Sequence, residues 1–173
     1  MANQDHVQGL QVLSFVLDGD HFAIGIDSIQ EVIEYKNVTR VPRSPEFMQG
    51  VINLRGQVIP VVDLRVLFSM AVADISLDTC IIIIDIDVDG EQCAIGIVAD
   101  SVKEVVEFDV SAIQPAPKIG LSVDNRFIYG MVEQAENLLI LLSIQQVFDA
   151  EDIQELLVPI EDNQLKGSNE AIE

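Results

Sequence analysis

Basic residues are scarce in this chain of 173 residues: nine lysines and arginines stand against 29 aspartates and glutamates, so the formal net charge is −20. Such a charge repels nucleic acids and anionic membrane surfaces at long range, and we expect neither as the main partner. No apolar run approaches the roughly 18 residues of a membrane-spanning helix, and residues 1–6 lack the pattern of a signal peptide. We therefore expect a cytoplasmic protein without direct membrane insertion.

Residues that commonly carry catalysis or bind metals are also few. The chain has two histidines and two cysteines, and none of the four has a partner at metal-ligand spacing. A hairpin centred on Asp89-Gly90 would set Cys80 opposite Ala99 rather than Cys93, which argues against a disulfide. No nucleophile elbow, phosphate-binding loop or dinucleotide fingerprint is present. We expect no catalytic residue, metal site or cofactor, and hence not an enzyme.

One segment resembles a calcium site. Residues 85–90, Asp-Ile-Asp-Val-Asp-Gly, match the opening of an EF-hand loop, but the twelfth position is Gly96 instead of the bidentate glutamate. The alternation of Ile and Val with Asp is typical of a half-exposed strand entering an Asp-Gly hairpin. The match therefore argues for a strand more than for a calcium loop. We keep an acidic calcium-binding or hydrolytic protein as an alternative from a different class.

With 49% hydrophobic residues, the chain is long enough for one domain or two small subdomains. Two copies of a unit of about 65 to 70 residues are visible. Residues 23–26 recur at 94–97, residues 27–34 at 100–107, and residues 47–51 at 127–131. Each copy combines short apolar strands, glycine-marked turns and one short helix, which predicts an all-β protein of two small barrels sharing an apolar contact.

The predicted boundaries follow from this repeat. We expect a flexible tail over residues 1–11, a domain over 12–158 and a flexible acidic tail over 159–173. Within the domain, the first barrel is predicted at about residues 22–79 and the second at about 80–148, with exchange of the N-terminal strand and the C-terminal helix between them left open. That C-terminal helix is predicted over residues 150–157.

The stretch from Gly50 to Leu64 holds the charged residue Arg55 between two apolar strands. The second copy carries Glu-Gln-Ala-Glu at residues 133–136, where the first has Asn-Leu-Arg-Gly at 53–56, so the barrel itself does not require the arginine. Residues 36–65 are also locally basic, with a net charge of +3 against −23 elsewhere. Two interpretations remain open: a salt bridge specific to one copy, or a surface that faces a partner.

The motif Phe-Met-Gln-Gly-Val-Ile-Asn-Leu-Arg-Gly at residues 47–56, followed by Ile-Pro-Val-Val-Asp-Leu-Arg at 59–65, resembles the CheW family of chemotaxis coupling proteins. The resemblance runs from about Val12 to about Leu157. It implies two five-stranded SH3-like barrels with a shared apolar seam, short helices and a C-terminal helix. It also implies a non-catalytic adaptor between the cytoplasmic signalling tip of chemoreceptors and the regulatory domain of the histidine kinase CheA, recruited to membrane receptor arrays.

Several site residues follow from the resemblance alone. Glu31 and Arg55 match the charged pair near the family's receptor-binding groove, and we expect them to lie close together. The apolar positions expected to line this groove are Ile29, Val98, Val102 and Val105. Asn53, Leu54 and Gly56 belong to the motif and are expected to orient Arg55, whereas Gln49 and Gly50 are assigned to kinase contact. The alternatives are a coupling module of a non-motility array for pili or development, the acidic calcium-binding or hydrolytic protein, and a nucleic-acid-binding double barrel.

Overall fold

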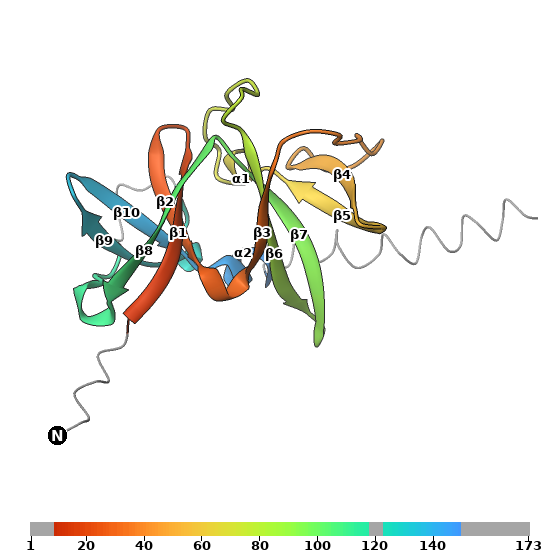
Figure 1. The fold of residues 1–173 in the computed structure, drawn as a ribbon. Coiled ribbons are helices and arrows are strands. Elements are labelled where there is room, and N and C mark those ends of the chain that lie inside the picture. Colours follow the sequence, from red (N-terminus) through yellow and green to blue (C-terminus); the bar gives the residue numbers. More distant parts are fainter. Residues whose placement is uncertain (1–8, 118–122, 150–173) are drawn as a thin grey trace, which may run out of the picture.

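The computed structural model describes residues 9–117 and 123–149, and these form two five-stranded sheets that lie side by side (Figure 1). We call the first barrel A; its strands, in sheet order, are β8 (Ser101–Asp109), β1 (Gly9–Leu17), β2 (Asp20–Gly25), β10 (Asn137–Leu142) and β9 (Ile128–Gln134). We call the second barrel B; its strands are β3 (Ile29–Glu34), β6 (Cys80–Val88), β7 (Glu91–Ala99), β5 (Gln57–Val62) and β4 (Met48–Leu54). The predicted all-β double-barrel fold is confirmed.

Each sheet closes on itself through one bridge between an edge strand and the segment that follows the other edge strand. After β3 the chain reaches Thr39, which pairs with Val51 of β4, and after β8 it reaches Gln114, which pairs with Met131 of β9. The two bridges occupy matching places in the repeat. Closure removes the long open edges that a five-stranded sheet would otherwise expose.

The five helices among the described residues are short, with three to six residues each. They are η2 (Ile26–Ser28), α1 (Leu64–Leu67), η3 (Val110–Ala112), η4 (Asn125–Phe127) and α2 (Ile144–Asp149). The side chain of Asp63 accepts a hydrogen bond from the backbone of Arg65, so this aspartate is the N-cap of α1, as the sequence predicts. Within the described residues, no helix has the length and apolar character needed to cross a bilayer.

The sheets do not follow the predicted division at residues 79 and 80. Barrel B is continuous, from β3 to β7, whereas barrel A joins the N-terminal β1–β2 hairpin to β8, β9 and β10. Each repeat therefore gives its first hairpin to one barrel and its last three strands to the other. The chain crosses from one sheet to the other through short connections, which are the three residues of η2 between β2 and β3 and Asp100 between β7 and β8.

Three apolar clusters explain how the barrels hold together. Two fill the barrel interiors: Ile52, Ile59, Val61, Ile81, Ile83 and Val98 in barrel B, and Val12, Ala23, Val132, Leu139 and Leu141 in barrel A. The third and largest lies between the barrels and includes residues of both sheets and of α1 and α2, among them Phe15, Phe22, Ile82, Ile97, Phe68 and Phe148. The predicted apolar seam is this third cluster, which we call the shared core.

Other local predictions can be compared with the strands. Cys80 pairs with Ala99 in the β6–β7 hairpin, as predicted, and the turn is made by Asp89 and Gly90, both with positive φ. The predicted N-terminal tail overlaps β1, because residues 9–11 already belong to that strand. The helix predicted over residues 150–157 and the tail over 159–173 lie outside the described residues.

Candidate functional site

The Asn-Leu-Arg-Gly motif forms the tip of the β4–β5 hairpin in barrel B. Leu54 pairs with Gln57, so Arg55 and Gly56 are the two turn residues, with φ values of 51° and 87°. Two positive φ values are what a type I′ turn requires. The side chain of Asn53 accepts a hydrogen bond of 2.9 Å from the backbone of Gly56, and Leu54 packs against the interior of barrel B. These contacts fix the direction in which Arg55 leaves the sheet.

Arg55 forms a salt bridge with Glu31 of β3. Nη2 of Arg55 donates to Oε2 of Glu31, and Nη1 lies 3.4 Å from Oε1. The bridge joins β3, one edge strand of barrel B, to the hairpin that holds the other edge strand, β4. The Arg55 side chain is nevertheless 68% exposed and that of Glu31 30% exposed. The salt bridge therefore connects two parts of barrel B, while the Arg55 guanidinium remains accessible to a partner.

The hydrogen bond from Arg55 lowers the pKa of the Glu31 carboxyl below its ordinary value of 4.5, and the smaller effect of desolvation opposes it. A lowered folded-state pKa stabilises the fold above pH 4.5, and this contribution is lost as the pH falls through the folded pKa. We expect Glu31→Gln to lower the melting temperature slightly at pH 7, and the gap to close on acidification.

Thermal unfolding of both proteins between pH 7 and pH 3 measures this gap. Glu46→Gln is the matched control, because Glu46 is exposed and has no ion-pair partner among the described residues. A difference between wild type and Glu31→Gln that stays constant across this range would show that the salt bridge contributes nothing to stability.

The four apolar positions assigned to the receptor groove differ in how far they are exposed to solvent. Ile29 and Val102, which correspond in the repeat, are half-buried at the margin of the shared core. Val105 is 55% exposed on β8. Val98 was assigned to the groove surface, and this is wrong: it is fully buried inside barrel B, because its side of β7 faces the barrel interior.

The two residues assigned to kinase contact have internal partners. Nε2 of Gln49 donates to the buried carboxylate of Asp63 at 2.9 Å, and Gly50 is buried where β4 passes Thr39. An added Cβ on Gly50 would collide with the carbonyl group of Thr39. Through these internal contacts both residues hold the β4–β5 hairpin in place. Gly50 is buried, so a partner cannot contact it directly in this conformation.

A buried ion network near the barrel B hairpin was not predicted. The Arg65 side chain is 2% exposed and binds Asp63 with two hydrogen bonds, from Nε to Oδ1 at 2.9 Å and from Nη2 to Oδ2 at 2.8 Å. Nη1 also donates to the carboxylate of Asp100 and to the carbonyl of Ala73. The hydrogen bonds to Asp63 raise the pKa of Arg65, so the arginine stays charged despite its burial.

This network also reaches barrel A. The second carboxylate oxygen of Asp100 accepts a hydrogen bond of 2.8 Å from the backbone of Asp18, at the β1–β2 turn. The carboxylate of Asp18 in turn accepts one of 3.2 Å from the backbone of Ala71, in the segment after α1. The signal in the sequence was the Asp-Leu-Arg run directly after an apolar strand. Its partner Asp100, 35 residues away, could be found only in the fold.

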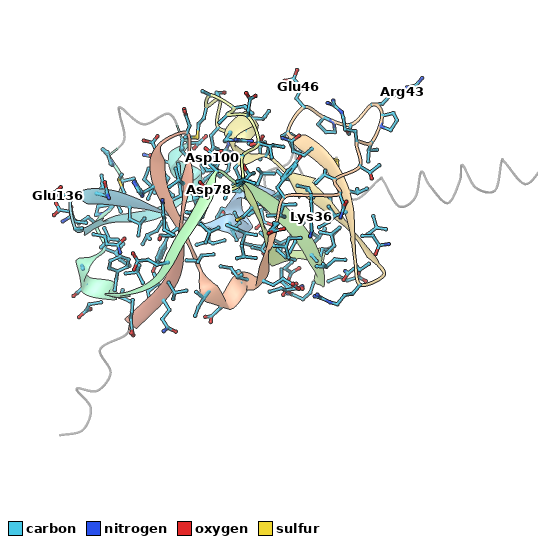
Figure 2. The ribbon with its side chains drawn as sticks, turned by 45° about the horizontal axis from the view of Figure 1, so that its top comes forward. Lys36, Arg43, Glu46, Asp78, Asp100 and Glu136 are labelled. Atoms are coloured by element: carbon cyan, nitrogen blue, oxygen red, sulfur yellow. The ribbon has the colours of Figure 1, made fainter. Side chains whose placement is uncertain are left out.

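Charge is distributed unevenly over the two barrels. The connection between β3 and β4 carries the exposed residues Lys36, Arg40 and Arg43, and Figure 2 shows Lys36 and Arg43 on barrel B and Glu136 at the far end of barrel A. The locally basic region predicted from the sequence is thus partly a surface and partly the buried Arg65. In the part of the chain that the structure describes, no group of three or more potential metal ligands is found.

Comparison with known proteins finds relatives in both sequence and fold. The family model described as CheW-like domain matches residues 11–152. The chemotaxis protein CheW of Bacillus subtilis is 33% identical over 150 residues, 84% of this chain and 91% of that protein, and that of Klebsiella aerogenes is 32% identical over 145 residues, 84% and 85%. The crystal structure of the scaffolding protein TtCheW from Thermoanaerobacter tengcongensis superposes with a TM-score of 0.75 at 29% identity, covering 87% of this chain and 95% of that one.

Proposed function

The chain belongs to the CheW family, and we propose that it is a non-catalytic adaptor that couples the cytoplasmic tips of chemoreceptors to the histidine kinase CheA in chemotaxis signalling. In this proposal the protein is cytoplasmic and is recruited to receptor arrays through its two partners. The observation that carries the proposal is the exposed Arg55 guanidinium on a fixed turn, beside Glu31, within a motif that resembles the family's coupling motif.

The fold supplies what an adaptor needs. The shared core and the Arg65 network tie the two barrels together, so surfaces on different barrels keep a constant separation and orientation. An adaptor with fixed geometry converts a change in one partner into a displacement of the other without chemistry of its own. We place the receptor surface around Arg55, Glu31, Ile29, Val102 and Val105.

Receptor binding by Arg55 can be measured separately from folding. We expect Arg55→Ala to weaken binding of a receptor signalling-tip fragment by about tenfold, because a desolvated arginine at an interface is often worth more than 1 kcal/mol. Arg126→Ala is the matched control: Arg126 is 69% exposed and is paired with Asp124, but it lies on barrel A. Both variants are compared with wild type by calorimetry after circular dichroism has shown them to be folded.

A double-mutant cycle separates partner contact from internal pairing. If Arg55 contacts the receptor, Arg55→Ala weakens binding even in the Glu31→Gln background. Equal binding by wild type and Arg55→Ala, with coupling of the two positions seen only in stability, would place Arg55 outside the interface.

A further inference from the structure

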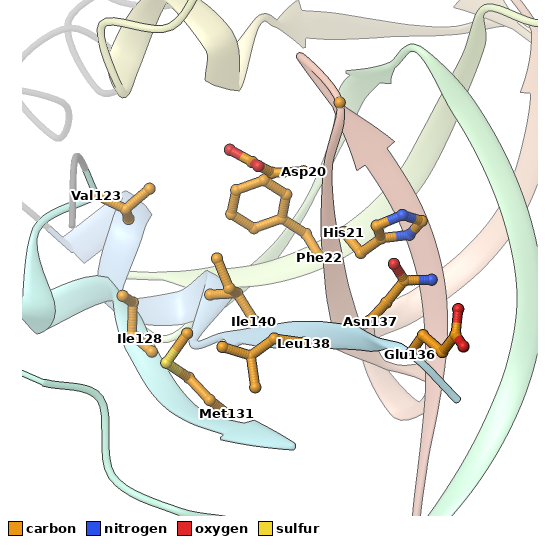
Figure 3. A pocket seen from close by; sticks show the side chains of 11 residues that line it. Asp20, His21, Phe22, Val123, Ile128, Met131, Glu136, Asn137, Leu138 and Ile140 are labelled. Carbon is orange, nitrogen blue, oxygen red and sulfur yellow. The ribbon is translucent and has the colours of Figure 1, made fainter. Parts of the chain in front are cut away.

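Barrel A has a pocket of about 460 Å³ at the place where β2 and β10 pair in parallel and β9 follows (Figure 3). Its apolar lining consists of Phe22, Val123, Ile128, Met131, Leu138 and Ile140. Phe22 and Ile140 belong to the side of the sheet that faces the shared core, whereas their neighbours Ala23 and Leu139 fill the barrel interior. The pocket is thus a hollow at the border of the shared core, outside the barrel.

The edge of the pocket is polar and acidic. Asp20, at the end of the β1–β2 turn, and Glu136, in the β9–β10 turn, are both exposed, and neither carboxylate makes a hydrogen bond or ion pair with another described residue. His21 and Asn137 complete the polar part of the lining. Leu138, next to Asn137, is 50% exposed and continues the apolar lining out to the surface. Figure 3 shows these side chains around the opening.

The repeat shows that the fold does not require this lining. At the matching positions of barrel B, offset by 71 or 80 residues, the residues that replace Phe22, Glu136 and Ile140 are Cys93, Gly56 and Pro60. Barrel B therefore lacks the aromatic ring and one of the two carboxylates, although its strands have the same order. The chemistry of this pocket is specific to barrel A.

We propose that this pocket binds a bulky apolar side chain presented by a basic segment of a protein partner. The six apolar lining residues suit a single aromatic or aliphatic anchor of the kind that dominates many protein interfaces, and the polar lining residues can contact the groups that flank this anchor. Asp20 and Glu136 can then pair with lysine or arginine beside that anchor, which complements the acidity of the chain. The surface is separate from Arg55, and the inference does not depend on the receptor or kinase as partner.

Nuclear magnetic resonance of the isotope-labelled full chain tests this with three synthetic pentapeptides. The probes are Lys-Arg-Phe-Leu-Lys, its charge-reversed form Glu-Asp-Phe-Leu-Glu, and Lys-Arg-Ser-Ser-Lys, which lacks the apolar anchor. We expect the first to shift the amide signals of residues 20–22 and 136–140 and to bind about fivefold more tightly than either of the others, with the preference over the acidic peptide falling at high salt.

Variants of the pocket edge complete the test. Asp20→Asn combined with Glu136→Gln should remove the preference for the basic peptide, whereas Glu91→Gln, at the position of barrel B that matches Asp20, should leave it unchanged. Three results would overturn the proposal. They are the absence of pocket-specific shifts at millimolar peptide, equal binding of the acidic peptide, or concentration-dependent shifts of the same amides without peptide, which would assign the pocket to a second copy of the chain.

Discussion

Arg65→Ala is expected to lower the free energy of unfolding by about 3 to 5 kcal/mol, the usual cost of removing one partner from a buried ion pair. The variant leaves the carboxylate of Asp63, which is 0% exposed, without its cation, and the carboxylate of Asp100 loses its ion pair with the Arg65 guanidinium. Gln49 and the α1 backbone still donate to Asp63, but they carry no charge to balance it. Urea unfolding followed by circular dichroism measures the loss.

The repeat offers a matched control for this variant. Gln145 stands at the position of α2 that corresponds to Arg65, and its amide exchanges hydrogen bonds with the backbone of Asp87 at 2.9 and 2.8 Å. No buried charge is involved, so Gln145→Ala should cost only about 1 kcal/mol. Gln145 also donates to the exposed carboxylate of Asp149 at 2.9 Å. Equal losses for the two variants would mean that the buried Arg65 network is no more important than these exposed hydrogen bonds.

Gly50→Ala is expected to cost about 3 kcal/mol or more, through backbone strain together with a collision. Gly50 has a φ of 149°, and an added Cβ would meet the carbonyl oxygen of Thr39 and lie 2.7 Å from its carbonyl carbon. A backbone group held by two hydrogen bonds between Thr39 and Val51 does not move away as a side chain would. The barrel closure should therefore open, with faster hydrogen exchange at the Val51 amide.

Gly25→Ala is the control for the glycine substitution itself. Gly25 has a φ of −63°, and no heavy atom lies within 4 Å of an added Cβ. This variant should be neutral or stabilise the protein by about 0.4 to 1 kcal/mol, because alanine restricts the unfolded chain. Similar unfolding free energies for both variants, with unchanged exchange at Val51, would show that the close passage at Gly50 relaxes without cost.

The fold class could be predicted from the sequence because its signals are local. Alternating strands, the Asp-Gly turn of β6–β7 and the Asp63 cap each depend on a few adjacent residues. The exchange of hairpins between barrels could not be predicted. A repeat shows which strands correspond, but corresponding strands can pair within or between copies. The resemblance alone placed Val98 at the groove, and the sequence gives no check on this placement, because the end of β7 is buried on both faces and shows no alternation.

The resemblance predicted correctly that two charged residues lie together, but it did not predict the environments of residues that it assigned one at a time. Glu31 and Arg55 lie together as expected, 24 residues apart in sequence. The resemblance assigns Gln49 and Gly50 to kinase contact, yet their environment depends on Asp63 and Thr39, which lie on other segments. The pocket of barrel A was missed because its lining comes from four separate stretches of the chain.

The proposed adaptor role is tested most directly by co-sedimentation of the protein with a receptor signalling-tip fragment and the regulatory domain of CheA. We expect wild type to bring both partners into one complex, and folded Arg55→Ala to keep the kinase domain while losing the receptor fragment. Arg126→Ala should retain both. If wild type binds neither partner across a range of salt concentrations, or binds them only in mutually exclusive complexes, the protein does not couple receptors to CheA.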